Sequence, residues 1–149
     1  MMSIRTAHPA DHPTIVDIAV RSGLFDADDA AFFGESLRET TAGAVLFIDG
    51  DRQGAAMLAP EPMSDAAWNL LFLAVDPSAQ RGGIGRALVT ESEAHARAAG
   101  GRMLLIDTAS IENQAAARAL YAALGFGHVA TIPGYYGDGV DRLTYLKRL

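Results

Sequence analysis

The sequence contains no cysteine among its 149 residues. Disulfide bonds, thiol nucleophiles and thiolate metal ligands are therefore excluded. The four histidines, His8, His12, His95 and His128, show no metal-ligand spacing with nearby carboxylates. We therefore expect no metal site, and we interpret the histidines as surface or packing residues.

Clusters of positive charge are also missing. The twelve Lys and Arg residues are scattered in a chain of net charge −6, and no basic run is longer than Lys147-Arg148. Proteins bind a nucleic-acid backbone mainly through clustered cations, so we expect no nucleic-acid partner. An acidic chain is better suited to a cationic acceptor such as an amine.

Long apolar stretches are absent as well. The longest apolar run, Leu70 to Val75, is too short to span a bilayer as a helix. The first five residues lack a basic region followed by an apolar stretch, which a signal peptide would have. Half of the residues are hydrophobic and a fifth are charged. This composition predicts a soluble cytoplasmic protein without a membrane partner, with residues 1–149 forming a single domain.

Hydrophobic patterning predicts an α/β chain in the order β-α-α-β-β-β-α-β-α-β-β. Two strand-to-helix units in its middle favour a mixed sheet with helices on both faces. Gly50-Asp51 is typical of a hairpin turn, and Pro133 to Gly139 are predicted to form a loop. The predicted strands are 3–7, 44–48, 54–58, 68–75, 103–106, 126–132 and 143–149, and the predicted helices are 10–20, 26–39, a long helix ending near 99, and 112–124.

A glycine-rich turn follows the buried strand that ends at Val75. It contains Gly82, Gly83 and Gly85 and leads directly into the long helix. Glycine lets the backbone approach a ligand closely, and the first amides of a helix have no partner within it. Together with the helix dipole they form an anion site that suits a pyrophosphate.

Two common nucleotide motifs do not fit this turn. A P-loop requires Gly-Lys-Ser/Thr, whereas Gly85 is followed by Arg86-Ala87. A dinucleotide-binding fingerprint requires a small residue three positions after Gly85, where the chain has Leu88. The spacing that does fit is Gln80-x-x-Gly83-x-Gly85, which resembles the pyrophosphate-binding signature of the GNAT acetyltransferases. An ordinary glycine-rich turn is the alternative for this motif taken alone.

A second segment strengthens the resemblance. Asn113, Ala117, Leu120-Tyr121 and Leu124-Gly125-Phe126 resemble the other GNAT signature, Asn…Ala…Leu-Tyr…Leu-Gly-Phe. From position 113 to position 121, Asn113, Ala117 and Tyr121 drift by only about 80° around a helix, so they can line one edge of an elongated ligand. The closing segment, Ile132-Pro133-Gly134-Tyr135-Tyr136, resembles that of a GNAT subgroup.

The resemblance implies a GNAT fold: a mixed sheet of about six or seven strands, about four helices on its two faces, and central parallel strands that splay apart. It implies acetyl-coenzyme A as cosubstrate, with its pantetheine arm paired to the backbone of the central strand and its pyrophosphate on the glycine turn. The residues implied in binding it are Ala74, Val75, Gln80, Arg81, Gly82, Gly83, Ile84, Gly85, Arg86 and Asn113. Homodimers are common in the family, and the sequence leaves that assembly open.

Tyr121 is our candidate for the acid that assists the leaving thiolate. A phenol with a pKa near 10 can protonate or hydrogen-bond a thiolate as its charge develops. An aromatic side chain packed in the core is the alternative role for this residue.

The attacking amine must lose a proton, and the base is harder to assign. The glutamate that many GNAT enzymes carry on the central strand is missing, because Asn69 is followed only by apolar residues through Val75. Asp107, just past the second buried strand, is our candidate for a base or a substrate contact. A strand-end carboxylate facing water, with proton relay to bulk solvent, is the alternative.

Tyr135 and Tyr136 lie in the glycine-rich segment, where we expect a loop that covers the acceptor pocket; a simple surface hairpin is the alternative. The sequence as a whole predicts an N-acetyltransferase that acts on a primary amine of a small metabolite or of a protein N-terminus. A non-catalytic acyl-coenzyme A sensor is the alternative, and a GNAT-shaped interaction module without a ligand is a third option.

Overall fold

The computed structural model describes residues 3–24, 26–38 and 42–149. They contain one seven-stranded sheet with the order β1-β2-β3-β4-β5-β7-β6. Only β4 and β5 run parallel; the other neighbours pair antiparallel, so the sheet is mixed. The strands are β1 (Ile4–Thr6), β2 (Val45–Asp49), β3 (Gly54–Pro60), β4 (Ala67–Val75), β5 (Met103–Ala109), β6 (Gly127–Gly137) and β7 (Val140–Arg148).

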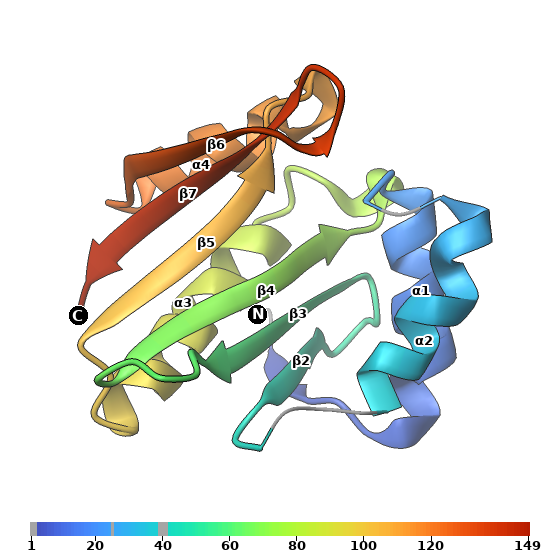
Figure 1. Ribbon diagram of the computed structural model, residues 1–149. Helices are drawn as coiled ribbons and strands as arrows, with labels where there is room; N and C mark the ends of the chain where they lie inside the picture. Colours follow the sequence, from blue (N-terminus) through green and yellow to red (C-terminus); the bar gives the residue numbers. More distant parts are fainter. Residues whose placement is uncertain (1–2, 25, 39–41) are drawn as a thin grey trace.

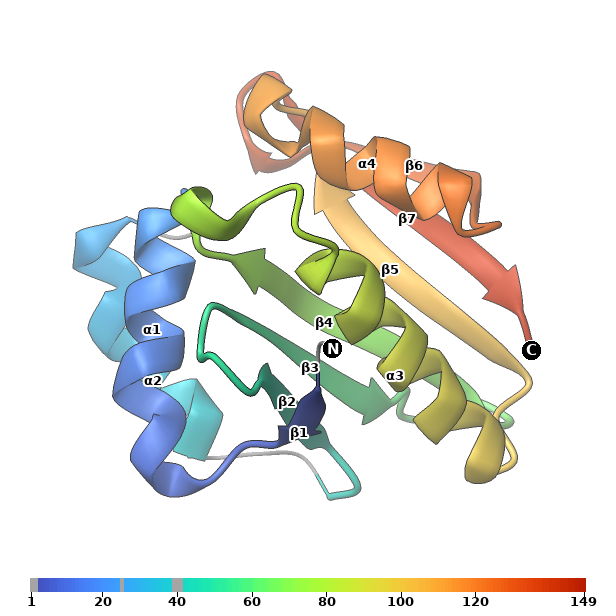
Figure 2. The same ribbon diagram turned by 180° about the vertical axis from the view of Figure 1, so that it is seen from behind.

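Helices cover both faces of the sheet, as the sequence predicts (Figures 1 and 2). The helices are α1 (His12–Arg21), α2 (Ala30–Arg38), α3 (Ile84–Ala98) and α4 (Ala115–Ala123). On one face α1 and α2 pack over β2, β3 and β4 through Ile15, Ile18, Phe33 and Phe72. Within the described ranges no helix has the length and apolar character needed to cross a membrane.

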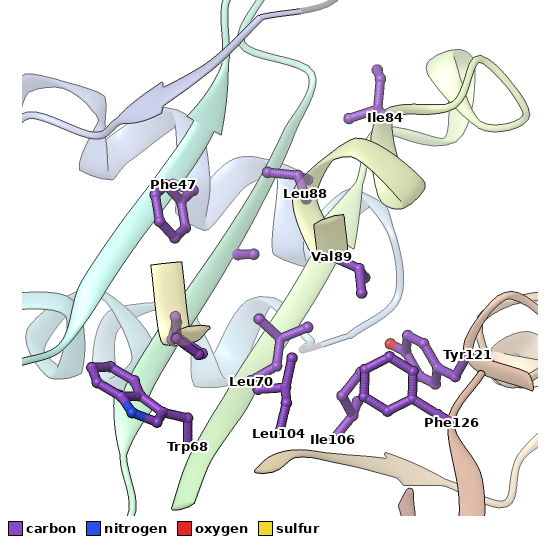
Figure 3. Close-up of a cluster of buried hydrophobic side chains, with 13 residues drawn as sticks. Phe47, Trp68, Leu70, Ile84, Leu88, Val89, Leu104, Ile106, Tyr121 and Phe126 are labelled. Carbon is purple, nitrogen blue, oxygen red and sulfur yellow. The ribbon is translucent and has the colours of Figure 1, made fainter. Parts of the chain in front are cut away.

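The second core lies between the opposite face of the sheet and helices α3 and α4 (Figure 3). Alternation along β5 sends Leu104 and Ile106 into this core, where they meet Leu88 and Val89 from the apolar stripe of α3. Tyr121 from α4 completes the cluster. Because both helices are anchored by apolar burial, the glycine turn that precedes α3 and the start of α4 are held in fixed positions.

The two parallel strands separate before they end. Their pairing stops at Leu70 and Ile106, although β4 continues to Val75 and β5 to Ala109. Leu71 is the extra residue of a bulge in β4, since Leu58 pairs with Leu70 and Met57 already pairs with Phe72. We call the resulting gap the β4–β5 split. It confirms the splayed central strands expected for the fold.

The C-terminal segment differs from the prediction. Residues 133–137 belong to β6 rather than to a loop, and the hairpin turn is reduced to Asp138 and Gly139. The pairing nevertheless skips residues 133–136, because Ile132 pairs with Arg142 and the next pair joins Gly137 to Val140. Four residues therefore bulge from the edge of the sheet. We call residues 133–136 the tyrosine bulge.

Other boundaries also differ from the prediction, and β5 continues to Ala109, so Asp107 lies inside this strand and not just past its end. Strand β7 begins at Val140, three residues before the predicted start. The predicted helices that begin at 10, 26 and 112 each open with a short 3-10 turn, so the α-helices start later.

Lys147 shares the core face of β7 because its Nζ pairs with Glu93 of α3 at 2.9 Å. That ion pair explains a cation in an otherwise apolar position.

Candidate active site

The turn between β4 and α3 is held by a carboxylate at its start. Asp76 Oδ1 accepts hydrogen bonds from the amide and the hydroxyl of Ser78 at 3.0 and 2.8 Å, and Arg21 pairs with Asp76 Oδ2 at 2.7 Å. Gln80 donates from Nε2 to the carbonyl of Val75 at 3.4 Å, which folds the turn back on the strand. These contacts fix the path of the chain into the glycines.

The end of the turn adopts two left-handed conformations. Arg81 has φ 72° and Gly83 has φ 86°, and Gly83 is the N-cap residue of α3. A left-handed conformation costs a non-glycine residue about 1–2 kcal/mol, so the strain at Arg81 marks a backbone shape that its surroundings enforce. No side chain caps the helix start. Its first amides therefore remain available to an anion.

Gly85 has a different reason to be glycine. A Cβ there would lie 3.2 Å from Leu120 Cδ2 and 3.8 Å from Val75 Cγ2. The missing side chain lets the first turn of α3 approach both α4 and the end of β4. The two glycines of the signature thus have different structural roles. Gly83 allows the left-handed backbone conformation of the turn, and Gly85 allows α3, α4 and β4 to pack closely.

A cavity of about 450 Å³ lies at this junction. Its walls come from the end of β4, the glycine turn, the start of α3, one side of α4 and the end of α1. The lining residues are Ser22, Leu24, Leu73, Ala74, Val75, Ala79, Gln80, Arg81, Gly83, Ile84, Gly85, Arg86, Asn113, Gln114, Ala116, Ala117 and Leu120. Every residue that the sequence assigned to cosubstrate binding is among them except Gly82.

Asn113 is brought to the cavity by the 3-10 turn, Glu112–Gln114, that leads into α4. Arg118 donates from Nη1 to the carbonyls of Ala109 and Ile111 at 2.7 and 2.8 Å, which ties this helix to the end of β5. A Cβ on Gly23 would lie 3.2 Å from Asn113 Nδ2, so the end of α1 closes in on the same amide. The cavity therefore combines unpartnered helix amides, two arginines at its rim and an amide side chain, a donor set that fits a pyrophosphate and its pantetheine arm.

Tyr121 lies one helical turn beyond Ala117, past the residues that line the cavity. The side chain is 4% exposed and packs against Phe126 (Figure 3). It also packs against Tyr145. Burial, with a smaller contribution from Tyr145, raises the pKa of the Tyr121 hydroxyl well above its ordinary value. The hydroxyl makes no hydrogen bond to any other residue that the structure describes. The Tyr121 hydroxyl therefore stays protonated, and its proton is available to hydrogen-bond a ligand.

Asp107 lies at the centre of a polar cluster on the other face of the sheet. Since Ile106 points into the α3–α4 core, alternation places Asp107 on the opposite face, where Figure 1 shows no helix in front of β5 and β7. Thr144 donates to Asp107 Oδ1 at 2.6 Å, and Arg142 donates to Oδ2 at 2.8 Å. Asn69 donates to the same Oδ2 at 3.4 Å. Both oxygens of the proposed base are therefore engaged.

The tyrosine bulge adjoins this cluster. Tyr135 and Tyr136 are 55% and 49% exposed and meet edge to face at 4.9 Å, and the Arg142 guanidinium lies 5.0 Å from the centre of the Tyr135 ring. Burial and the charge of Asp107 raise the pKa of Tyr136. Asp141 accepts from the Gly134 amide at 3.0 Å, which anchors the bulge to the turn.

The sequence interpretation missed Asn69, Arg142 and Thr144 as members of a site. In the sequence Asn69 stands out only as the residue before an apolar run. The available signal was the polar pair Arg142 and Thr144 at alternate positions of the last strand, which places both on the face of Asp107. The structure brings Asp107, Tyr135 and Tyr136 together, whereas Tyr121 lies on the other face of the sheet.

Comparison with known proteins agrees with this geometry. The model of the acetyltransferase (GNAT) family matches residues 4–126. The chain therefore belongs to the GNAT acetyltransferase family, and its seven-stranded mixed sheet with four helices is consistent with the GNAT fold. Among curated proteins no sequence matches.

Similar solved structures cover nearly the whole chain. A GNAT-family protein from Desulfovibrio desulfuricans is 27% identical with a TM-score of 0.89, and 99% of each chain is covered. The ribosomal-protein-S18-alanine N-acetyltransferase from Escherichia coli is 24% identical with a TM-score of 0.80, covering 99% of this chain and 94% of that one. A Salmonella typhimurium protein solved with its cofactor acetyl-CoA is 22% identical with a TM-score of 0.75, over the same shares.

Proposed function

We propose that this protein, as a single-domain cytoplasmic enzyme, binds acetyl-coenzyme A in the cavity at the β4–β5 split and transfers the acetyl group to a primary amine. The acceptor is the amine of a small metabolite or of a protein N-terminus. The observation that carries the proposal is the coincidence of the split with the glycine turn, since a linear thioester with a pyrophosphate can occupy both at once. Similar structures include one solved with acetyl-CoA.

The chemistry divides between the two faces of the sheet. The amine nitrogen attacks the thioester carbonyl carbon, the carbon–sulfur bond breaks, and the thiolate takes a proton. Tyr121 hydrogen-bonds the sulfur as its charge develops, because burial keeps the hydroxyl protonated; burial also raises the pKa of Tyr121 above that of a thiol, so the thiolate takes its proton from solvent. A backbone N–H of β4 past Leu70, which has no partner in β5, polarises the carbonyl oxygen.

The proton lost by the amine goes to water in this proposal. Both oxygens of Asp107 already accept hydrogen bonds from Arg142 and Thr144. Asp107 therefore acts by holding the polar cluster in place beside the split. Tyr135 and Tyr136 contribute the wall of the acceptor pocket.

Calorimetric titration of acetyl-coenzyme A into the protein and into a Gly83→Trp variant tests the donor site. We expect micromolar binding that the variant loses, because a bulky side chain at φ 86° both strains the turn and fills the cavity. If the unaltered protein does not bind acetyl-coenzyme A, the proposal is wrong.

A non-catalytic acyl-coenzyme A sensor is the second candidate. The engaged state of Asp107 favours it, since hydrogen bonds from Asn69, Arg142 and Thr144 already occupy both oxygens of that carboxylate. Release of coenzyme A thiol on addition of amines separates the two functions: an enzyme releases thiol in proportion to the acetylated amine, and a sensor binds acetyl-coenzyme A without releasing it.

A further inference from the structure

Two polar atoms beside Asp107 are buried and have no partner among the described residues. They are Asn69 Oδ1, in a side chain that is 6% exposed, and Arg142 Nε. A buried polar atom without a partner costs about 1–3 kcal/mol, so such atoms call for an explanation at each site.

The orientation of Asn69 follows from its neighbours. Its Nδ2 lies 3.1 Å from Glu61 Oε2 and 3.4 Å from Asp107 Oδ2, and carboxylate oxygens only accept hydrogen bonds. The NH₂ group must therefore face the two carboxylates, and the carbonyl oxygen is the atom left over. The unmet group of Asn69 is a hydrogen-bond acceptor.

The unmet group of Arg142 is a donor, and it adjoins the same carboxylate. Arg142 uses Nη2 to reach Asp107 Oδ2, the oxygen that also receives Asn69. The side chains that carry the acceptor without a partner, Asn69 Oδ1, and the donor without a partner, Arg142 Nε, thus both contact the same oxygen, Asp107 Oδ2. A single ligand group that carries an N–H and an oxygen acceptor in close succession would satisfy both.

We propose that Asn69 and Arg142 recognise an α-amino carbonyl compound, the grouping at the end of a peptide chain, as the acceptor. Asn69 Oδ1 accepts a hydrogen bond from an N–H of the acceptor, and Arg142 Nε donates to the carbonyl oxygen beside it. The inference rests on the proposed acetyl transfer and narrows its acceptor from any primary amine to this class.

Position and charge support this choice. Asn69 comes just before the last paired residue of β4 and Asp107 just after the last paired residue of β5, so a ligand held by Asn69 and Arg142 lies beside the start of the split, near where the thioester would end. A polyamine would satisfy Asn69 Oδ1 but leave Arg142 Nε unmet, and it would bring a second cation toward the guanidinium. Arg142 therefore disfavours simple alkyl polyamines.

Access to the two atoms requires a movable wall. Tyr135 stacks on the Arg142 guanidinium, and residues 133–136 have no regular pairing with β7. The tyrosine bulge is the part of the wall that can shift to admit the acceptor. Its half-exposed rings then supply apolar contact to the first side chain of the peptide.

A matched pair of small amines tests the proposal. Alaninamide and isopropylamine share the branched amine carbon, but only alaninamide carries the carbonyl. We expect the protein to favour alaninamide in kcat/KM by about 10-fold or more, with rates compared per concentration of free base.

Three variants sharpen the test. Arg142→Lys keeps the positive charge but removes the Nε donor, and Asn69→Leu removes the acceptor. Each should bring the ratio of the two amines toward one, chiefly through KM, while acetyl-coenzyme A affinity stays unchanged. Arg148→Lys is the control, since Arg148 lies on the same face of β7, paired with Met103 and remote from Asp107. A ratio near one in the unaltered protein, or an unchanged ratio in both site variants, overturns the inference.

A second measurement separates this inference from the proposed function. Calorimetric titration of alaninamide and of isopropylamine into the coenzyme A-loaded protein reports the preference without turnover. If the protein binds alaninamide selectively and Arg142→Lys abolishes this selectivity, the inference about the acceptor is supported. Should no acetyl group be transferred in the same protein, only the proposed enzyme activity is wrong. Equal binding of the two amines contradicts the inference even if both are acetylated.

Discussion

The cavity takes most of its lining from a single run of chain, residues 73–86, whereas the polar cluster around Asp107 draws on three strands, β4, β5 and β7. The contacts of Asp107 with Asn69, Arg142 and Thr144 span 38, 35 and 37 residues of sequence. The first region offers backbone amides and the second offers side chains. A ligand common to a whole family can be bound by backbone geometry, while a particular acceptor needs particular side chains.

The largest expected effect comes from Gly83→Val, which alters the donor region alone. A β-branched residue at φ 86° adds strain of about 1–2 kcal/mol to the steric block, so acetyl-coenzyme A affinity should fall by at least about 100-fold in calorimetry. Gly100→Val is the matched control, because Gly100 has φ 81°, a Cβ added there would meet no atom within 4 Å, and the residue lies at the far end of α3. Equal loss of affinity in both variants would mean that strain, and not the site, is responsible.

Tyr121→Phe should give the next largest effect. Removing the hydroxyl should lower kcat by about 100-fold and leave the affinity for acetyl-coenzyme A unchanged. Because the pKa of Tyr121 is raised, the protonated form persists to above pH 10, and the rate should show no alkaline decline from this residue below that value. Tyr145→Phe removes a hydroxyl from the neighbouring ring as a control. Equal kcat for the two variants would assign Tyr121 to packing.

Asp107→Asn probes the acceptor region. It should raise the KM of the amine about 10-fold as Arg142 and Thr144 lose their charged partner, with acetyl-coenzyme A affinity unchanged. If Asp107 only positions these side chains, the pH–rate profile keeps its shape. A rate loss that is larger at low pH than at high pH would instead identify Asp107 as the base, and would contradict proton transfer to water.

The smallest effect is expected for Asp76→Asn in the donor region. Hydrogen bonds from Ser78, and then the charge of Arg21, lower the pKa of Asp76 below its ordinary 3.8. A lowered pKa contributes stability that is present above pH 3.8 and disappears as the pH falls through the lowered value. The Tm difference between the two proteins should therefore be visible at pH 7 and shrink below pH 3.8, and Glu91→Gln on the surface of α3 should show no such trend. A difference that persists in acid would exclude the ionised carboxylate as its source.

The two regions also differ in how far the sequence predicts them. Apolar periodicity and the glycines placed every helix and strand in the right order, and most of the cavity wall followed from contiguous motifs, although Ser22 and Leu24 at the end of α1 were not predicted. The tyrosine bulge was wrongly predicted as a loop because Pro133, Gly134 and Gly137 favour turns locally, whereas the pairing with β7 depends on partners that local pattern does not reveal. The Asn69–Arg142 pair could not be predicted for the same reason, since its geometry exists only after β4, β5 and β7 have assembled.

The β4–β5 split leaves two strand edges in the middle of the sheet. Exposed strand edges invite pairing with other chains and are a common route to aggregation. Here the edge of β4 past Leu70 is recessed between α3, α4 and the end of α1, in a cavity that another chain cannot easily enter. A ligand lying along that edge would take the place of the missing strand. The recess thus lets the split act as a pairing edge for a small ligand while it stays closed to the edge of another chain.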